Sequence, residues 1–190
     1  MSMEKLVRQA ARAIVTNIAC LKEKLNVLVI CGLHNKTLAE HITLESYAMK
    51  AYPYLWVFDE KIFLKNVKIL CEDEIAILPE YLRSLLENSN VIIWLSQFDD
   101  LEKFPLGVRK AMISFWDTVE EAIKAKPRLY VNLLSAKCME YMSINYEQYL
   151  KSFIKAVNVN YSKIRRFGNA LASKLNEKSK FMFMTRKALI

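Results

Sequence analysis

The stretch LNVLVICGL, residues Leu25 to Leu33, decides the fold of this chain. It is a continuous apolar run, rich in β-branched valine and isoleucine, and it is too short for a typical helix. Such a run is typical of a strand buried on both faces, as in a parallel sheet covered by helices. Gly32 ends the apolar core of the run, and we expect a short turn into a helix after it.

The helix that follows this strand has a predicted start. Thr37 is followed three residues later by Glu40, which is the spacing of a capping box. In that motif the threonine hydroxyl accepts a hydrogen bond from a backbone N–H, and the glutamate reaches back to a second one. The spacing predicts a helix over Leu38–Ala51, which Tyr52 and Pro53 end.

The rest of the chain repeats this strand-then-helix pattern. Further apolar runs predict strands at Leu55–Phe58, Val91–Leu95 and Leu129–Leu134. Alternating residues predict a short extra strand within Lys61–Leu70, and FMFMT predicts a last one at Phe181–Thr185. Helical periodicity covers residues 3–21, 77–90, 106–125, 136–142, 146–156 and 161–175.

Strands that alternate with helices predict an α/β fold. We expect a three-layer sandwich with a mostly parallel, Rossmann- or flavodoxin-like sheet and helices on both faces, joined by right-handed crossovers. Without a linker that would split the chain, we expect a single α/β domain over residues 1–178. Residues 179–190 would form a terminal strand and tail.

Composition excludes several classes of protein. Hydrophobic residues make up 53% of the 190 and charged residues 25%, which is typical of a globular chain rather than a disordered one. No apolar run approaches the roughly 20 residues that cross a bilayer, so we expect no membrane partner. The N-terminus intersperses charges among its apolar residues and lacks a signal-peptide core. Four widely separated cysteines predict buried free thiols in a reducing cytoplasm: Cys20, Cys31, Cys71 and Cys138.

Positive charge is concentrated near the C-terminus. From Tyr161 onward there are eight basic residues and one acidic residue, a net +7 of the chain's formal +8. We expect a helix there whose apolar stripe is buried and whose basic side chains face outward; the stripe is Ile164, Phe167, Leu171 and Leu175. Such a surface predicts weak, non-specific nucleic-acid binding that fades with salt, because it rests on phosphate charge alone.

Candidate site residues follow the predicted strands. In open α/β sheets ligands bind beyond the carboxyl ends of the strands, at the point where the strand order reverses. We therefore predict a ligand pocket formed by Gly32, His34, Asn35, Asp59, Ser96 and Gln97, with Glu60, Asp99 and Asp100 nearby. Each of these residues is also compatible with an ordinary polar loop.

Three familiar kinds of site lack their sequence signatures. A dinucleotide site needs several glycines beside the pyrophosphate, and CGLHNKTLAE holds only Gly32. His34 and His41 are seven residues apart, whereas helical metal ligands want a spacing of three or four. A serine or cysteine triad needs a histidine base beside the nucleophile and a third group that orients it, and nothing in the sequence points to such a set. Six aromatic residues lie in predicted strands or on the inward face of a predicted helix, which favours core packing over base stacking: Trp56, Trp94, Phe115, Trp116, Phe181 and Phe183.

Short matches in the last third of the chain follow a known pattern. They are Ala136, Met142-Ser143, Tyr146–Ala156, Val159-Asn160-Tyr161, Gly168, Leu171-Ala172 and the closing FMFMT. On these residues the chain resembles the N-terminal domain of the thermophilic two-metal aminopeptidases, of the aminopeptidase T and aminopeptidase II type. The matches fall where that family leads from its N-terminal α/β domain to its catalytic domain. The opening helix, VLVICG, LPEYL and VIIWLSQ agree with the family more loosely.

The resemblance implies a domain without catalytic residues. Asn160 stands where the family usually has aspartate, and after Thr185 the sequence reads RKALI where the family continues into its metal-binding half. No catalytic residue or metal ligand of the family can be placed on this chain, so we expect no cofactor here; the family's two divalent metal ions would lie in the missing domain.

We therefore expect a non-catalytic scaffold or interaction domain, truncated or stand-alone, of an aminopeptidase-like metallopeptidase. Its partner would be a second copy of the chain or a separate catalytic domain. A basic nucleic-acid-binding module and an enzyme with an unrecognised site at the strand ends stay open as alternatives.

Overall fold

A parallel sheet lies at the centre of the structure. The computed structural model describes residues 3–66, 69, 72–99, 104–131 and 133–176. Within these residues the strands are β1 (Asn26–Gly32), β2 (Tyr52–Phe58), β3 (Val91–Leu95) and β4 (Arg128–Val131). All of their pairings are parallel, in the order β2-β1-β3-β4. The predicted α/β fold with a parallel sheet is confirmed, and the order matches the start of the flavodoxin-like arrangement.

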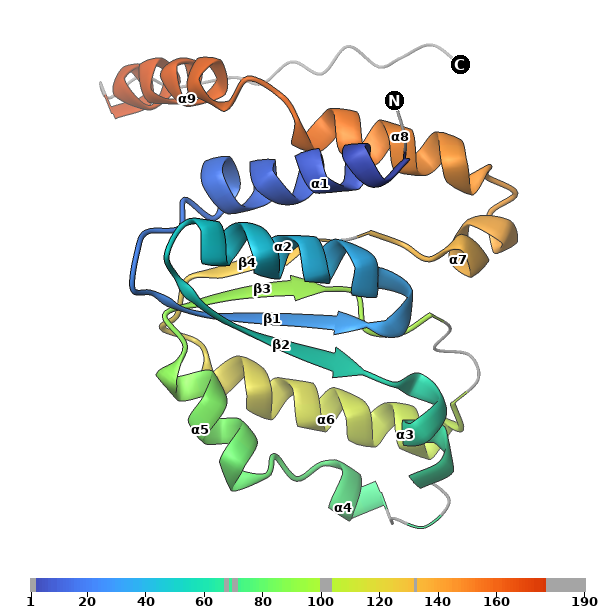
Figure 1. Cartoon of the computed structure of the whole chain (residues 1–190). Helices are drawn as coiled ribbons and strands as arrows, with labels where there is room; N and C mark the ends of the chain where they lie inside the picture. The colour runs from blue at the N-terminus through green and yellow to red at the C-terminus, as the bar shows by residue number, and fades with distance from the viewer. Residues whose placement is uncertain (1–2, 67–68, 70–71, 100–103, 132, 177–190) are drawn as a thin grey trace. The chain divides into compact units, whose positions relative to one another are not determined.

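Helices cover both faces of this sheet (Figure 1). The first part of the chain holds α1 (Met3–Ala13), a π-helical turn (Ile14–Ile18), a 3₁₀ turn (Leu33–Asn35), α2 (Lys36–Ala48), α3 (Glu60–Asn66), α4 (Glu72–Ile75) and α5 (Glu80–Asn88). The remainder holds α6 (Leu106–Ala122), α7 (Ala136–Tyr141), α8 (Tyr146–Val157) and α9 (Tyr161–Asn176).

Strand β1 is apolar from Val27 to Cys31 because helices cover both of its faces. Val27, Val29 and Cys31 belong to the core that includes α1, α2 and α8, whereas Leu28 and Ile30 belong to the core that includes α5 and α6. Successive side chains of a strand point to opposite faces, so a strand covered on both sides needs apolar residues at every position. This confirms the prediction made from the LNVLVICGL run.

Strand β2 begins earlier than predicted. Tyr52 and Pro53 do not end the preceding helix but are the first residues of β2, which lies at an edge of the described sheet. The Tyr52 N–H donates to the Leu25 carbonyl (2.8 Å). The alternation of the strand therefore turns the nitrogen of Pro53 toward the open edge, where a missing N–H costs no ladder hydrogen bond.

The predicted capping box is wrong. Helix α2 begins at Lys36, so Thr37 lies inside the helix rather than at its cap. The 3₁₀ turn leads straight into α2, and the Lys36 N–H donates to the Leu33 carbonyl without help from a side chain. Glu40 instead pairs with Lys36 one turn away (3.5 Å), an exposed ion pair of small energy.

The extra strand predicted within residues 61–70 is also wrong, because Glu60–Asn66 form helix α3. Asp59 starts this helix: its Oδ1 accepts hydrogen bonds from the N–H groups of Lys61 (2.8 Å) and Ile62 (3.2 Å). Phe63 then packs against the rings of Phe58 and Phe104. The cap at Asp59 and the packing of Phe63 thus stabilise a helix where the alternating sequence pattern had predicted a strand.

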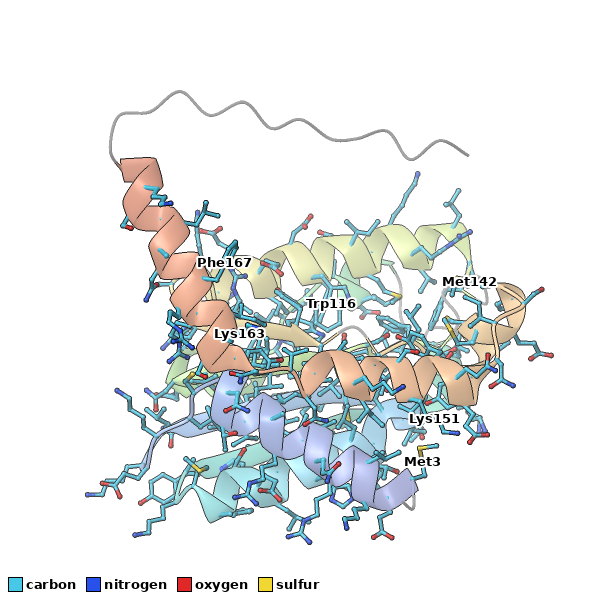
Figure 2. All side chains as sticks on the ribbon, turned by 90° about the horizontal axis from the view of Figure 1, so that it is seen from above. Met3, Trp116, Met142, Lys151, Lys163 and Phe167 are labelled. Atoms are coloured by element: carbon cyan, nitrogen blue, oxygen red, sulfur yellow. The ribbon has the colours of Figure 1, made fainter. Side chains whose placement is uncertain are left out.

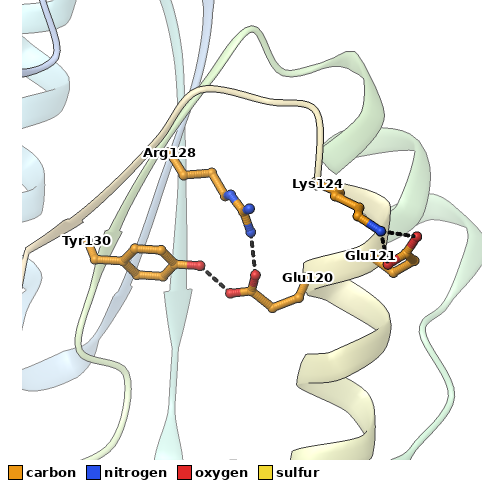
Figure 3. Close-up of polar contacts among 5 residues, drawn as sticks. All are labelled: Glu120, Glu121, Lys124, Arg128 and Tyr130. Carbon is orange, nitrogen blue, oxygen red and sulfur yellow. Dashed lines mark hydrogen bonds and ion pairs between the residues drawn. The ribbon is translucent and has the colours of Figure 1, made fainter. Parts of the chain in front are cut away.

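A carboxylate ties strand β4 to helix α6. Arg128 and Tyr130, both on β4, donate to the two oxygens of Glu120 near the end of α6 (Figure 3). Burial raises the pKa of Tyr130, and its hydrogen bond to Glu120 adds to that shift. The neighbouring pair of Glu121 and Lys124 is exposed and contributes little. The Glu120 contacts fix the position of this edge strand.

Among the aromatic residues predicted to be core, Trp56, Trp94, Phe115 and Trp116 do pack there, whereas Phe181 and Phe183 fall outside the described residues. Trp116 of α6, labelled in Figure 2, meets Trp94 of β3 edge to face with ring centroids 4.8 Å apart. Trp56 and Phe115 pack against the same core. Of the cysteines predicted to be buried, Cys31 is buried, Cys138 is half-buried and Cys20 is exposed. None of the helices in the described ranges combines the length and apolar character that crossing a membrane requires.

The chain divides into two compact units, residues 1–158 and 159–190. In the second unit, α9 agrees with the predicted helix, but the stripe of Ile164, Phe167 and Leu171 is exposed rather than buried. Figure 2 labels Lys163 and Phe167 on this helix. The predicted strand Phe181–Thr185 and the domain boundary at residue 178 fall outside the described residues.

We expect Ile93→Ala to lower the free energy of unfolding by about 2–5 kcal/mol, because it removes a fully buried side chain from a strand with neighbours on both sides. Ile113→Ala on α6 is the matched control, since Ile113 is 61% exposed. Urea unfolding of the two variants measures the difference. Equal, small effects would mean that β3 is not the centre of the core.

Candidate ligand pocket at the strand carboxyl ends

The carboxyl ends of β1 and β3 mark the reversal point of the sheet. From β1 the chain goes to β2 on one side and then crosses to β3 on the other. The arrowheads of β1, β2 and β3 point to the same edge (Figure 1). Of the predicted residues, Gly32 is the last of β1 at this edge, His34 and Asn35 follow it, and Ser96 and Gln97 follow β3. The structure therefore brings these two groups of predicted residues together.

Direct backbone contact closes the gap between these two strand ends. The Gly32 N–H donates to the Ser96 carbonyl (3.1 Å), which extends the pairing of β1 and β3 beyond β3 itself. A Cβ on Gly32 would lie 2.1 Å from the carbonyl oxygen of Gln97. In a dinucleotide-binding fold a glycine after the first strand makes room for the ligand's pyrophosphate. Here the chain's own Gln97 backbone fills that room.

Asn35, just after β1, is hydrogen-bonded to the loops that follow β3 and β4. It is 2% exposed, and its Nδ2 donates both to the Ser96 carbonyl (3.1 Å) and to the Leu133 carbonyl (3.0 Å). Ser96 follows β3 and Leu133 follows β4, so one side chain satisfies backbone oxygens of two loops. Asn35 thus has a structural role in the fold.

The acidic residues near this edge also make structural contacts. Asp59 caps α3, as described above, and a Glu60 carboxylate oxygen accepts from the Asp99 N–H (2.8 Å). The Asp99 carbonyl in turn accepts from the Cys138 thiol (3.3 Å) and, at the limit of hydrogen-bond length, from the Ser135 hydroxyl (3.5 Å). These bonds connect the loops after β2 and β3 to helix α7.

Beside this closed junction lies a small pocket of about 120 Å³. Its walls come from the ends of β1 and β3 and from the first turns of α3: Leu33, His34, Glu60, Lys61, Leu64, Gln97 and Asp99. The buried side-chain atoms without a hydrogen-bond partner in the described part of the chain are His34 Nε2, Asn35 Oδ1 and Gln97 Nε2. All three belong to this edge, and two of their residues line the pocket.

The environment of His34 disfavours its charged form. Burial lowers the pKa of His34 below its ordinary value of 6.5, and the carboxylates of Asp99 and Glu60 oppose this shift. At neutral pH the imidazole is therefore uncharged. On the same strand, burial raises the pKa of the Cys31 thiol to about 12. Cys31 is consequently unsuited to nucleophilic chemistry at neutral pH.

The described residues do not assemble a metal centre. Among them, no group of three or more histidine, cysteine, aspartate or glutamate side chains lies close enough to hold an ion. Asp100, which the sequence also suggested for this edge, lies outside the described residues. Asp59 does not line the pocket and serves as the cap of α3.

Sequence reasoning missed the contribution of α3 to the pocket. Lys61 and Leu64 line it, but their segment was predicted as a strand. The signal that could have found them is Asp59, because an aspartate directly after a strand and before mixed polar and apolar residues is a helix N-cap. A second, apolar cavity of about 70 Å³ adjoins this region and is lined mostly by aromatic rings, among them Phe63, Phe98 and Trp116.

The fold has a counterpart among solved structures. No protein-family model matches the chain, and no curated protein matches it in sequence. The structure is similar to that of wild-type AmpT from Thermus thermophilus, with a TM-score of 0.60 and 14% sequence identity. The similarity covers 82% of this chain and 43% of the AmpT chain. The chain thus spans less than half of AmpT, and at this identity the likeness shows the fold.

We expect the wild-type protein to lose stability relative to His34→Gln as the pH falls from about 7 through 6.5 and below. The unfolded chain takes up a proton at His34 that the folded chain resists, so the contribution is complete above the ordinary pKa and is lost on acidification. Thermal melting of both proteins between about pH 8 and 5 measures the difference. A difference that stays constant across this range would contradict the assigned environment.

Proposed function

We propose that the chain acts as a non-catalytic scaffold or interaction domain of an aminopeptidase-like protein. The observation that carries this proposal is the fold similarity, which takes in 82% of this chain but only 43% of AmpT. The sequence resemblance to the N-terminal domain of the aminopeptidase T type points to the same family. A domain that accounts for less than half of such a protein leaves the larger part to carry the reaction.

The use of the polar residues at the strand ends supports a structural role. Asp59 caps a helix, Asn35 holds two loop carbonyls, and Glu60 holds the Asp99 N–H. A catalytic carboxylate needs an oxygen directed at the substrate. These side chains instead direct hydrogen-bonding atoms at the chain's own backbone.

The two divalent metal ions of the resembled family find no matching residues in the described chain. Bridging metal ions need several carboxylates and imidazoles that converge on one point, and His34 and His41 are the chain's two histidines. His34 lines the pocket, whereas His41 is a half-buried residue on α2. We therefore assign this chain no reaction at such ions. We propose that its partner is a separate catalytic domain or a second copy of this chain.

The basic helix α9 favours a second candidate function, nucleic-acid binding. Its residues Lys163, Arg166 and Lys174 are exposed, and charge is the feature that supports this candidate. Binding of this kind would be weak, indifferent to base sequence and lost toward physiological salt. Tight binding that discriminates between sequences at physiological salt would favour this function over the scaffold.

We expect the purified chain to release no leucine from an aminoacyl-amide substrate and to bind neither zinc nor cobalt stoichiometrically, because its described residues form no convergent ligand set. A chromogenic leucine amide, with cobalt added, is the assay. AmpT itself, measured under the same conditions, serves as the positive control.

Cobalt-dependent release of leucine that a chelator abolishes would contradict the proposal. It would mean that the chain is itself a peptidase.

A further inference from the structure

Strand β2 has a hydrogen-bonding neighbour on one side among the described strands, and that neighbour is β1. Because the Tyr52 N–H donates to the Leu25 carbonyl, the alternation of the strand turns the backbone N–H and C=O groups of Leu55 and Val57 away from β1. Flavodoxin-like sheets of the order 2-1-3-4-5 add their fifth strand beside β4. In this arrangement β2 is therefore the end of the sheet, as its outermost place in Figure 1 shows.

The sequence of β2 does little to keep a further strand from pairing at this edge. Natural edge strands are commonly protected by charged residues, prolines, bulges or a very short length. β2 pairs with β1 residue for residue along its whole length, so it contains no bulge, and Pro53 protects only its start. The rest of the strand, Tyr54–Phe58, carries no charge, and Tyr54 is 57% exposed. At the other end of the described sheet, β4 is shorter and includes Arg128.

A second copy of β2 fits this edge in the antiparallel direction. With a two-fold axis at Trp56, Leu55 of each copy faces Val57 of the other. The outward N–H groups of both residues then meet outward carbonyls of the second copy, which is the pattern of an antiparallel ladder. Pro53 falls opposite Asp59, beyond the end of the second strand, so its missing N–H costs this pairing nothing.

The side chains along this junction are compatible with the pairing. Leu55 and Val57 pack against the core on one face of the sheet, and Trp56 packs against the core on the other face. The two-fold axis places Leu55 beside Val57, Trp56 beside its own copy and Tyr54 beside Phe58. Aromatic and β-branched pairs of this kind stabilise neighbouring strands. The chain's net charge of +8 opposes self-association, but no charged residue lies within β2.

The charges at the two ends of β2 favour the antiparallel direction over the parallel one. Lys50, which is exposed, precedes the strand, and Asp59 and Glu60 follow it. Antiparallel pairing brings the basic end of one copy toward the acidic end of the other. Parallel pairing would bring each lysine toward its own counterpart and the acidic residues toward theirs, which is unfavourable.

From these features we infer that the β2 edge is an interface for a second copy of this chain, paired antiparallel through Tyr54–Phe58 so that the two sheets become one continuous sheet. The inference rests on the second-copy form of the proposed function. Its failure is distinguishable from a failure of that function, because a monomeric chain would still serve a separate catalytic domain as a scaffold.

Sedimentation velocity of the full chain, over a series of concentrations at physiological salt, tests this interface. We expect the mass of the wild-type protein to rise with concentration from the 22.1 kDa of one chain toward twice that value. Val57→Pro removes an outward N–H from each copy and keeps the bonds to β1, as Pro53 already does. It should raise the Kd of the dimer about tenfold or more, because two hydrogen bonds are lost.

A charged variant tests the same edge without changing the backbone. Tyr54→Lys places a charge within the paired segment and should also raise the Kd of the dimer. Tyr52→Lys is the matched control, since Tyr52 is 60% exposed on the same strand but lies outside the paired segment. It should not raise the Kd. Circular dichroism of each variant checks that the chain is folded.

A wild-type chain that stays monomeric at every concentration would overturn the inference. Slow hydrogen exchange of the Leu55 and Val57 amides in such a monomer would assign the edge to another segment of the same chain. A dimer that neither Val57→Pro nor Tyr54→Lys weakens would also overturn it, because the two copies would then meet elsewhere.

Discussion

The junction of β1 and β3 rests on a hydrogen bond from the Gly32 N–H to the Ser96 carbonyl, and the rest of the edge depends on it. Both strands are central, and their side chains belong to the cores on both faces of the sheet. The bond forms because residue 32 has no side chain. Its backbone angles, φ −81° and ψ 167°, are ordinary for any residue, so the requirement for glycine comes from space and not from conformation.

This close approach of Gly32 to the Gln97 backbone also determines whether a ligand can enter at the reversal point of the sheet. In folds of this topology the same point opens to receive a ligand, but here Gln97 fills it and Asn35 holds the adjoining carbonyls. The available space is displaced toward α3, where the pocket is small and lined by charged side chains.

The layers of the fold could be predicted from the sequence, because a continuous apolar run such as Val91–Leu95 is typical of a strand buried on both faces. The exact first and last residues of the helices and strands were harder to predict. Thr37 and Glu40 have the spacing of a cap, but a 3₁₀ turn already satisfied the backbone before them. The candidate site was predicted as a set of strand-end residues, which do meet. Asp59 directly after a strand was a sequence signal for a helix cap, but the alternating residues after it favoured a strand, so the contribution of Lys61 to the pocket was missed.

The closure of β1 on β3 is tested most directly by the unfolding free energy of Gly32→Ala against Gly168→Ala. An alanine at position 32 would place its Cβ 2.1 Å from a backbone oxygen, whereas a Cβ at position 168 meets nothing within 4 Å. The account predicts a loss of about 1–3 kcal/mol or more for Gly32→Ala, from the forced shift of the Gln97 backbone, and no loss for Gly168→Ala, which lies in a helix that alanine favours. Equal stability of the two variants would contradict it.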